Sequence, residues 1–399
     1  MLIQFSLKNV LSFKNKYTLD MTAVNAYKEH MYNLIDIGGK EKYLKVASIY
    51  GANASGKSNL LFAFWLFQKI VNQSFNNEED VFTESDNTVI RQFYLPFCFD
   101  DEKQDSEFEI VELNNTTEYR YGFEYNETQI VSEWFYKKDL NKKRTITIFE
   151  RDHQTFEFGA SVRKECEQYS NKIRRETLAI SFFNKLQLNN RVFSDLYSQI
   201  MSMRVLTPGL CEDNKILERF LPSTIKAHKK RLLEFLDAID SGIVDIEYKE
   251  DKKEFITYHE GIDGELYPLL LFNESDGTLK SINLFIFIMI AINDDISIFV
   301  DELNVKLHPL VMKFIIDLFY EYNSNAQLIY TSHDTTLLDK KFFRRDQIWF
   351  VQKDKYGRSE LSALSDFRVR SDASFEKDYL AGVYGGIPYI KEFVMKAGE

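Results

Sequence analysis

Eight residues from Gly51 to Ser58 have the types and the spacing that bind a chain of phosphates. They read GANASGKS and match the pattern GxxxxGK[ST], whose glycines let consecutive backbone N–H groups face phosphate oxygens at a helix N-terminus. Lys57 would neutralise the β and γ phosphates, and the Ser58 hydroxyl would bind Mg²⁺. The alternative is an ordinary glycine turn. The sequence predicts a site for ATP and Mg²⁺ formed by Gly51, Asn53, Ala54, Ser55, Gly56, Lys57, Ser58 and Asn59.

Two adjacent carboxylates, Asp301 and Glu302, follow the β-forming run ISIFV at 296–300. A central strand that ends in acids can deliver one of them to a magnesium ion, so we expect Asp301 to bind Mg²⁺ directly or through water. Glu302 would then lie next to the γ-phosphate as the general base that polarises the attacking water. A strand that simply ends in solvated acids is the alternative. Together with the loop at Gly51, the pair indicates ATP hydrolysis.

His333 ends another apolar run, LIYTS at 328–332. A neutral histidine at the C-terminal end of a strand can form a hydrogen bond with the γ-phosphate or with the attacking water. A lone histidine is more often structural. Its position after the strand that carries Asp301 and Glu302 favours a catalytic role.

A second phosphate-binding surface is predicted in the segment NESDGTLKS at 273–281, immediately before an apolar helix. It offers the Ser275 hydroxyl, the N–H group of Gly277 and a helix N-terminus. Two such surfaces on one chain suggest that two copies pair head to tail, so that Ser275 of one closes over the γ-phosphate bound by the other. A plain helix cap followed by a glycine turn is the alternative.

These residues need strands and helices to position them. Alternating runs predict strands at 3–10 and 17–21, a buried strand at 44–50, and an antiparallel sheet over 93–150 that includes FYLPFCF at 93–99. Residues 160–240 are charged and rich in helix-forming residues. From 243 onward strands and helices alternate again, ending with a strand at 328–331, so one nucleotide-binding fold brackets the helical segment.

We therefore predict an α/β fold of three parts. Residues 1–159 would form the N-terminal half of an ATPase head with the phosphate-binding loop and the antiparallel sheet. Residues 160–242 would be a helical insertion. Residues 243–399 would complete the head with the Ser275 loop, the acidic pair and His333.

Composition limits the function classes. The net charge of −11 disfavours indiscriminate tight binding to nucleic acid, although a local basic patch is compatible with it. The three cysteines, Cys98, Cys166 and Cys211, are typical of a reducing cytosol. The N-terminus lacks the features of an export signal, and the most apolar run, 282–292, is too short to span a bilayer. We expect a cytoplasmic protein.

The order of these motifs resembles that of ABC-type ATPases of the SMC, OLD and recombination kind. Segments such as NVLSFKNKYTLDM, YGANASGKSNLL, DELNVKLHPL and YLAGVYGGIPYI look like the AAA-type abortive-infection ATPases, including the ATPase subunits of two-gene phage-defence systems such as PARIS. The resemblance implies an ABC-type P-loop ATPase head with an antiparallel β subdomain and an inserted helical lobe. It also implies an oligomeric, ATP-dependent sensor or scaffold that controls a separate effector encoded beside it, with a phage protein as a possible trigger.

The chain departs from this resemblance at two places. ABC ATPases usually carry a glutamine that contacts Mg²⁺ and water, and the nearest match here is Gln92, before YLPFCF. OLD nucleases continue into an acidic metal-binding domain, whereas 66 residues follow His333. Nuclease activity is therefore expected of a partner.

Two other functions remain open. A DNA-handling ATPase of the recombination type could use the basic clusters Lys172/Arg174/Arg175 and Lys226/Lys229/Lys230/Arg231. A transporter's nucleotide-binding subunit fits the sheet at 93–150 and the segment at 160–240 poorly. Arg344 and Arg345 could reach a phosphate across an interface, but such a pair is more often only on the surface.

Overall fold

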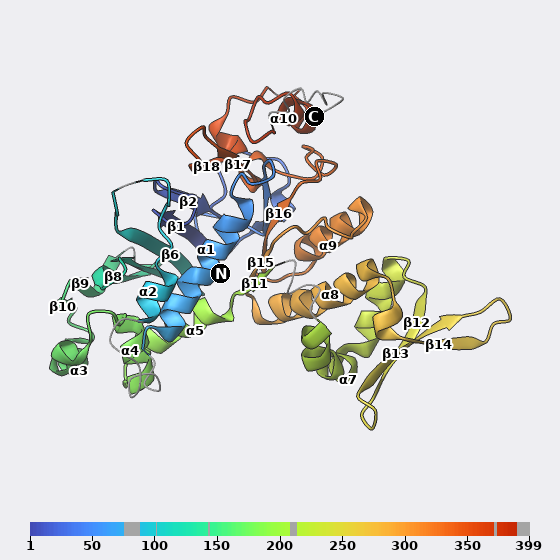
Figure 1. Cartoon of the computed structure of the whole chain (residues 1–399), viewed down its shortest axis with the longest axis horizontal. Coiled ribbons are helices and arrows are strands. Elements are labelled where there is room, and N and C mark those ends of the chain that lie inside the picture. The colour runs from blue at the N-terminus through green and yellow to red at the C-terminus, as the bar shows by residue number, and fades with distance from the viewer. Residues whose placement is uncertain (76–87, 101, 143, 208–213, 371–372, 389–399) are drawn as a thin grey trace, which may run out of the picture.

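The computed structural model describes residues 1–75, 88–100, 102–142, 144–207, 214–370 and 373–388. Cys211 and the final two residues of YLAGVYGGIPYI lie outside the described residues. Figure 1 shows two sheets on either side of a long helix, further helices beyond the second sheet, and a small sheet that extends away from them.

A six-stranded sheet forms the centre of the fold, in the order β11-β15-β16-β5-β17-β18. All neighbouring pairs are parallel except β17 and β18. The carboxyl ends of β5, β16 and β15 therefore lie side by side, with β16 in the middle. The strands are β11 (Arg204–Leu206), β15 (Ser297–Val300), β16 (Gln327–Ser332), β5 (Val46–Tyr50), β17 (Ile348–Lys353) and β18 (Ser359–Ala363).

A seven-stranded antiparallel sheet lies beside it, in the order β10-β9-β8-β7-β6-β1-β2. Its presence confirms the antiparallel sheet expected from the alternating runs. Its strands are β10 (Thr155–Phe158), β9 (Arg144–Asp152), β8 (Ile130–Asp139), β7 (Thr117–Tyr125), β6 (Ser106–Asn114), β1 (Leu2–Lys8) and β2 (Tyr17–Asp20).

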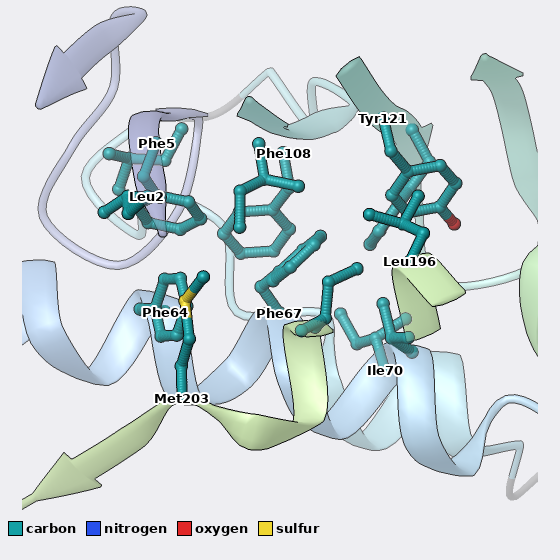
Figure 2. Packing of buried hydrophobic residues seen from close by; sticks show 14 of the residues in the cluster. Leu2, Phe5, Phe64, Phe67, Ile70, Phe108, Tyr121, Leu196 and Met203 are labelled. Atoms are coloured by element: carbon teal, nitrogen blue, oxygen red, sulfur yellow. The ribbon is translucent and has the colours of Figure 1, made fainter. Parts of the chain in front are cut away.

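Helix α1 (Lys57–Gln73) packs between the two sheets. Phe64 stacks on Phe299 of β15 with ring centroids 4.2 Å apart and meets Phe5 of β1 at 5.0 Å. Figure 2 shows Phe64, Phe67 and Ile70 of α1 facing Phe5, Phe108 and Tyr121 of the antiparallel sheet. Large rings on both sides of α1 thus fix the helix that begins at Lys57, and with it the phosphate-binding loop.

Three helices cover the other face of the central sheet: α7 (Asn214–Ala238), α8 (Asp276–Asp294) and α9 (Pro309–Glu321). They share one apolar core with β5, β15 and β16. Among the described residues, α8 is long and apolar enough to cross a membrane. However, 61% of its most apolar 18-residue stretch is buried inside the structure, as in the core helix of a globular fold. The expected buried helix is therefore present, although it is longer than the apolar run 282–292 suggested.

A three-stranded antiparallel sheet in the order β12-β13-β14 leads from α7 to α8. It consists of β12 (Ile243–Lys249), β13 (Glu254–Glu260) and β14 (Leu266–Leu270). In Figure 1 this yellow sheet extends away from the rest of the molecule, so part of its surface lacks a neighbour among the described residues.

Short elements complete the described structure. The helices are α2 (Val89–Phe93), α3 (Arg163–Cys166), α4 (Ala179–Leu186), α5 (Val192–Ser202) and α10 (Phe375–Leu380). The 3₁₀ turns are η1 (Met31–Asn33), η2 (Glu167–Lys172), η3 (Leu271–Asn273), η4 (Arg345–Gln347) and η5 (Leu364–Asp366), and the remaining strands are β3 (Leu34–Ile35) and β4 (Tyr43–Leu44).

Two local expectations were wrong. The run FYLPFCF is not a strand: α2 ends at Phe93, and the segment continues as a loop in which Asn9 accepts a hydrogen bond from the Phe97 N–H at 3.1 Å. Pro96 has no N–H to donate to a neighbouring strand. Arg344 is fully buried rather than on the surface, because it pairs with Asp346 at 2.8 Å and donates to backbone carbonyls such as that of Glu29.

The helical segment at 160–242 divides between the two cores. Helices α4 and α5 pack with α1 and the antiparallel sheet, whereas α7 packs with α8. Strand β11, inside this segment, joins the central sheet beside β15. The boundaries at 159 and 242 stay a prediction.

Candidate functional site

The glycine-rich loop connects β5 to α1, which is the position expected from the sequence. Gly56 caps α1 with φ 116°, a conformation that favours glycine, and Ala54 has φ 59°. Asn53, Ala54 and Ser58 are exposed, and Asn59 is half-buried. The loop therefore presents its backbone and the first turn of α1 to solvent, where a phosphate chain could bind.

Neighbouring strands leave no space for a side chain at Gly51 or Gly56, the two glycines of the loop. A Cβ at Gly51 would lie 2.3 Å from the Val351 carbonyl oxygen of β17, and one at Gly56 would lie 2.2 Å from the Ser359 hydroxyl of β18. Ser359 also donates to the Ser55 carbonyl at 2.6 Å. The loop is thus held from the central sheet as well as by its own turn.

Ser12 ties the antiparallel sheet to the same loop. Its hydroxyl lies within hydrogen-bond distance of the Ser359 hydroxyl at 2.7 Å and accepts a hydrogen bond from the Asn59 amide at 2.8 Å. Sequence reasoning missed both Ser12 and Ser359 as supports of the loop. Ser12 lies within the NVLSF segment that carried the family resemblance, whereas no sequence signal marks Ser359.

Lys57 is buried, with 5% of its surface exposed. Its ammonium donates to the carbonyls of Gly51 at 2.8 Å and Ala52 at 3.1 Å, and it lies 3.5 Å from His333 Nδ1. Burial lowers the pKa of Lys57 to about 8, against the opposing effect of Asp301 and Glu302. Because the ammonium contacts both the loop carbonyls and His333, it lies at the edge of the sheet where β5 and β16 end.

Asp301 lies directly beyond β15 and is 6% exposed. The Thr331 hydroxyl of β16 donates to Asp301 Oδ1 at 2.6 Å and accepts from the Glu302 N–H at 2.7 Å. This single hydroxyl therefore fixes both acidic residues relative to the strand that carries His333. Thr331 was missed from the sequence, because its position inside an apolar run indicates only a strand.

Glu302 is half-buried and has φ 50°, so the chain turns sharply at the predicted general base. Lys280 of α8 supports that turn, since its ammonium donates to the carbonyls of Glu302 at 3.0 Å, Leu303 at 3.1 Å and Val305 at 2.7 Å. Lys280 is only 2% exposed. It was not singled out from the sequence, because its partners lie in a distant segment.

His333 follows β16, and its Nδ1 lies 3.5 Å from the Lys57 ammonium. Its backbone N–H donates to the Asn304 side chain at 3.2 Å, which links it to the loop after Glu302. Burial, followed by the charge of Lys57, lowers the pKa of the His333 imidazole. The ring is therefore neutral at pH 7 and can accept a hydrogen bond.

The donor set fits a Mg²⁺ ion bound together with phosphates. Such an ion needs only one or two protein oxygens, because phosphates and waters supply the rest, and Ser58 and Asp301 offer a hydroxyl and a carboxylate. The described residues contain no group of three or more His, Cys, Asp or Glu side chains able to hold a metal without phosphates. The Ser55 hydroxyl is buried in the loop with no hydrogen-bond partner among the described residues, which suits a loop built around an added ligand.

Ser275 caps α8 and is exposed. Its hydroxyl accepts a hydrogen bond from the Thr278 N–H at 3.1 Å. Within one chain, Ser275 therefore acts as an ordinary helix cap, which was the alternative considered from the sequence. A Cβ at Gly277 would lie 2.8 Å from the Lys306 carbonyl oxygen, and Lys306 pairs with Asp276 at 3.2 Å. The N-terminus of α8 is therefore packed on the segment that follows Glu302.

The structure brings together Lys57, Asp301, Glu302 and His333, and it places Ser275 and Gly277 at a separate exposed helix end. Gln92 is exposed on α2, and its assignment as the glutamine near Mg²⁺ stays a prediction. The roles of all these residues in binding and catalysis likewise stay predictions.

Comparison with known proteins gives one family. Residues 46–339 match the family described as "AAA domain, putative AbiEii toxin, Type IV TA system". No curated protein matches the chain.

Two solved structures are similar to it. One is the SMC head domain from Thermotoga maritima, at 15% identity and a TM-score of 0.42, covering 92% of this chain and 99% of that one. The other is an SMC head bound to the C-terminal winged-helix domain of ScpA, at 14% identity and a TM-score of 0.43, covering 95% and 99%.

Proposed function

We propose, from the premise that this chain belongs to the AAA-domain family associated with AbiEii-type toxins, that it binds and hydrolyses ATP in the presence of Mg²⁺. The observation that carries the proposal is the convergence of one buried cation, two acids and a neutral histidine at the ends of β5, β15 and β16. Lys57 lies within 3.5 Å of His333, and Thr331 joins Asp301 to the same strand at 2.6 Å.

Binding would begin at the loop between β5 and α1. Its backbone N–H groups and the N-terminus of α1 would receive the phosphate oxygens, and Lys57 would exchange the carbonyls of Gly51 and Ala52 for the β and γ phosphates. Ser58 and Asp301 would hold Mg²⁺, which when bound supplies positive charge to the phosphates. The pinning of the loop by Ser12 and Ser359 would reduce the conformational entropy lost on binding.

Hydrolysis would use the two residues that follow β15 and β16. Glu302 would accept a proton from the attacking water, and the neutral His333 ring would form a hydrogen bond with that water or with the γ-phosphate. Lys280 and Thr331 would act as positioning residues, because they hold the backbone of Glu302.

Two chains would complete each site. The exposed N-terminus of α8, with Ser275 and Gly277, has the chemistry to close over a γ-phosphate bound by a second copy. ATP would then join two heads, and hydrolysis would release them.

The cellular role that we propose is a cytoplasmic sensor or scaffold subunit of a bacterial anti-phage, abortive-infection system. Its ATP-bound oligomer would restrain or activate a separate effector protein encoded beside it, and a phage protein would be the trigger. Membership of a family named after toxins of toxin–antitoxin systems supports this role. Phage protection should be lost when Lys57→Ala or Glu302→Gln replaces the native residue, and full protection by either variant would rule out its dependence on ATP.

The decisive measurement for the ATPase itself combines light scattering with phosphate release, with and without ATP and Mg²⁺. We expect the mass to rise with ATP, and Glu302→Gln to hold the larger species while phosphate release stops. Unchanged mass together with normal hydrolysis would overturn the pairing through Ser275.

A DNA-handling ATPase is the lesser candidate. In α7 the basic cluster is partly neutralised, since Lys229 pairs with Asp245 at 2.6 Å and Lys230 with Glu234 at 3.7 Å. Salt-sensitive binding of duplex DNA would favour this candidate over the defence role.

A further inference from the structure

The projecting sheet β12-β13-β14 has one packed face and one open face. Register pairs Thr257 with Leu269 and Ile256 with Leu270, so alternate residues of each strand lie on opposite faces, although Tyr267 on the packed side is itself 53% exposed at the edge of the sheet. On the packed face Phe255 is 3% and Thr257 0% exposed. The other face, which we call the outer face, carries Ile256, Tyr258, Leu266, Pro268 and Leu270.

Large apolar side chains on the outer face are in contact with solvent. Leu266 is 53% exposed and Leu270 is 46% exposed, and Pro268 between them is exposed as well. Ile262, in the turn between β13 and β14, is fully exposed. Neighbouring exposed apolar residues of this kind mark surfaces that bind another molecule.

The three strands and the turns between them carry an excess of acidic residues, of which Asp245 on β12 is paired with Lys229 of α7. Residues 243–274 contain nine aspartates and glutamates against three lysines and no arginine. Alternation places Glu247 and Glu260 on the outer face itself, and Tyr258 donates to Glu247 at 2.9 Å. A partner should therefore combine apolar side chains with lysine or arginine.

A second copy of the chain is a poor occupant. It would bring two equally acidic surfaces into contact, which costs free energy through like-charge repulsion. Extension of the sheet by an added strand is also disfavoured, because Pro268 lacks an N–H on the free edge strand β14. The side chains of the outer face, rather than the backbone of β14, would make the contact.

A continuous series of contacts joins this sheet to the nucleotide site. Glu274, next to Ser275, accepts hydrogen bonds from the Thr257 hydroxyl and lies 2.7 Å from His259 Nε2, both on β13. Ser275 then begins α8, whose Lys280 holds the backbone of Glu302. A displacement of the small sheet would thus be transmitted to both the pairing surface and the predicted general base.

We propose that the outer face is the docking site for the effector, through a protein segment that alternates apolar with basic residues. The proposal rests on the proposed function, because it names the surface through which the ATPase controls its partner. Docking and the nucleotide state would be coupled through Glu274 and Ser275, so that each changes the affinity for the other.

The test uses three labelled synthetic peptides and the full chain. The first alternates leucine with lysine, the second replaces lysine by glutamate, and the third replaces leucine by serine. Fluorescence anisotropy should show binding of the first alone. The double variant Leu266→Glu/Leu270→Glu should weaken binding at least about tenfold, as expected for the loss of anchoring side chains. Ile146→Glu, which replaces an apolar residue 42% exposed on β9, is the matched control and should bind normally.

Four results would overturn the docking proposal. The first three are equal binding by the double variant, equal binding of the glutamate peptide, and no binding of the lysine peptide. A fourth is a nucleotide-free dimer that the double variant converts to monomer, because the outer face would then be occupied by a second copy.

The two proposals fail in different ways. Lys57→Ala should lose phosphate release and keep peptide binding, whereas the double variant should keep phosphate release and the ATP-dependent increase in mass. Peptide binding by a native chain that releases no phosphate would leave the docking surface standing and reject the ATPase.

Discussion

The chemistry of single residues depends on how each charge is buried. Lys57 satisfies its ammonium with two carbonyls of its own loop, and the same burial that lowers its pKa lowers that of His333. The motif predicted the presence of both residues but not their contact, because 276 residues separate them along the chain. Asp301 and Glu302 were predictable from their position after an apolar run, whereas the hydroxyl of Thr331 that joins them was not.

Lys57 gives a testable pH dependence. Phosphates favour the charged ammonium, whose pKa is about 8 in the described structure, so ATP affinity should fall as pH rises above 8. The decrease should approach about tenfold per pH unit, since one proton is taken up on binding. Titration of a fluorescent ATP analogue with Mg²⁺ from pH 7 to 9.5 measures it. Lys57→Arg should flatten the profile because guanidinium keeps its charge, and a flat native profile would contradict the prediction.

Glu112 of β6 gives a second prediction, which concerns the pH dependence of stability. Both carboxylate oxygens are buried and have no hydrogen-bond partner among the described residues. Burial raises the pKa of Glu112 to about 8, against the opposing charge of the Met1 amine. A carboxyl whose pKa is higher in the folded state loses stabilising effect as pH rises through that pKa.

Glu112→Gln should therefore stabilise the protein more at pH 8 than at pH 5.5, by on the order of 3 kcal/mol in the free energy of unfolding. Urea titration at the two pH values measures the difference. The same gain at both values would show that Glu112 does not ionise in this range.

At the scale of elements, α8 connects the exposed cap at Ser275 with the segment that follows Glu302. Its N-terminus carries Ser275, and its first turn packs through Gly277 on the segment after Glu302. Lys280, one turn further along, donates hydrogen bonds to backbone carbonyls of the same segment. This helix is apolar on most of its circumference because it is buried between the central sheet and α7. A lysine in such a helix is unfavourable unless its hydrogen bonds are complete.

Lys280→Met should lower the free energy of unfolding by about 3 kcal/mol, because three backbone carbonyls lose a charged donor. It should also reduce kcat more than it raises KM for ATP, since it releases the backbone of Glu302 and leaves the phosphate-binding loop intact. Urea titration and steady-state phosphate release measure the two effects.

Lys313→Met is the control, because Lys313 meets Asp317 one turn away on the surface of α9. Such exposed pairs contribute at most about 1 kcal/mol. Equal losses in the two variants would remove any special role for Lys280.

The elements themselves were largely predictable where apolar periodicity was strong. Strands β5, β15 and β16 and helix α8 lie where continuous apolar patterns indicated them. FYLPFCF was wrong because aromatic residues alone suggest a strand, while Pro96 and the contacts with Asn9 favour a loop. Strand β14 was missed because LYPLL contains a proline, and its pairing with β13 depends on the intervening turn.

At the scale of the whole molecule, the two larger sheets share α1, and the small sheet extends on the far side of α8 (Figure 1). The exposed Ser275 and the buried Lys57 therefore belong to different surfaces of one chain. If each complete site takes Lys57 from one copy and Ser275 from another, defects in the two residues should complement each other.

Lys57→Ala and Ser275→Arg should each abolish hydrolysis when pure. An equimolar mixture should recover about a quarter of native activity, because half of the dimers are mixed and each mixed dimer holds one intact site of two. Phosphate release from the mixture measures it. An inactive mixture would mean that Lys57 and Ser275 act within one chain or not at all.

The strand order of the central sheet also has a consequence for synthesis on the ribosome. Strand β5 and the loop after it appear early, but their neighbours β16 and β17 begin at Gln327 and Ile348. At typical translation speeds β5 would wait roughly 15–60 s for a partner strand. For most of that interval the nascent chain carries the glycine-rich loop without Asp301 and Glu302, and His333 follows only after β16. A ribosome halted before His333 would thus leave a fragment without the predicted catalytic centre, so only chains translated past that residue could hydrolyse ATP.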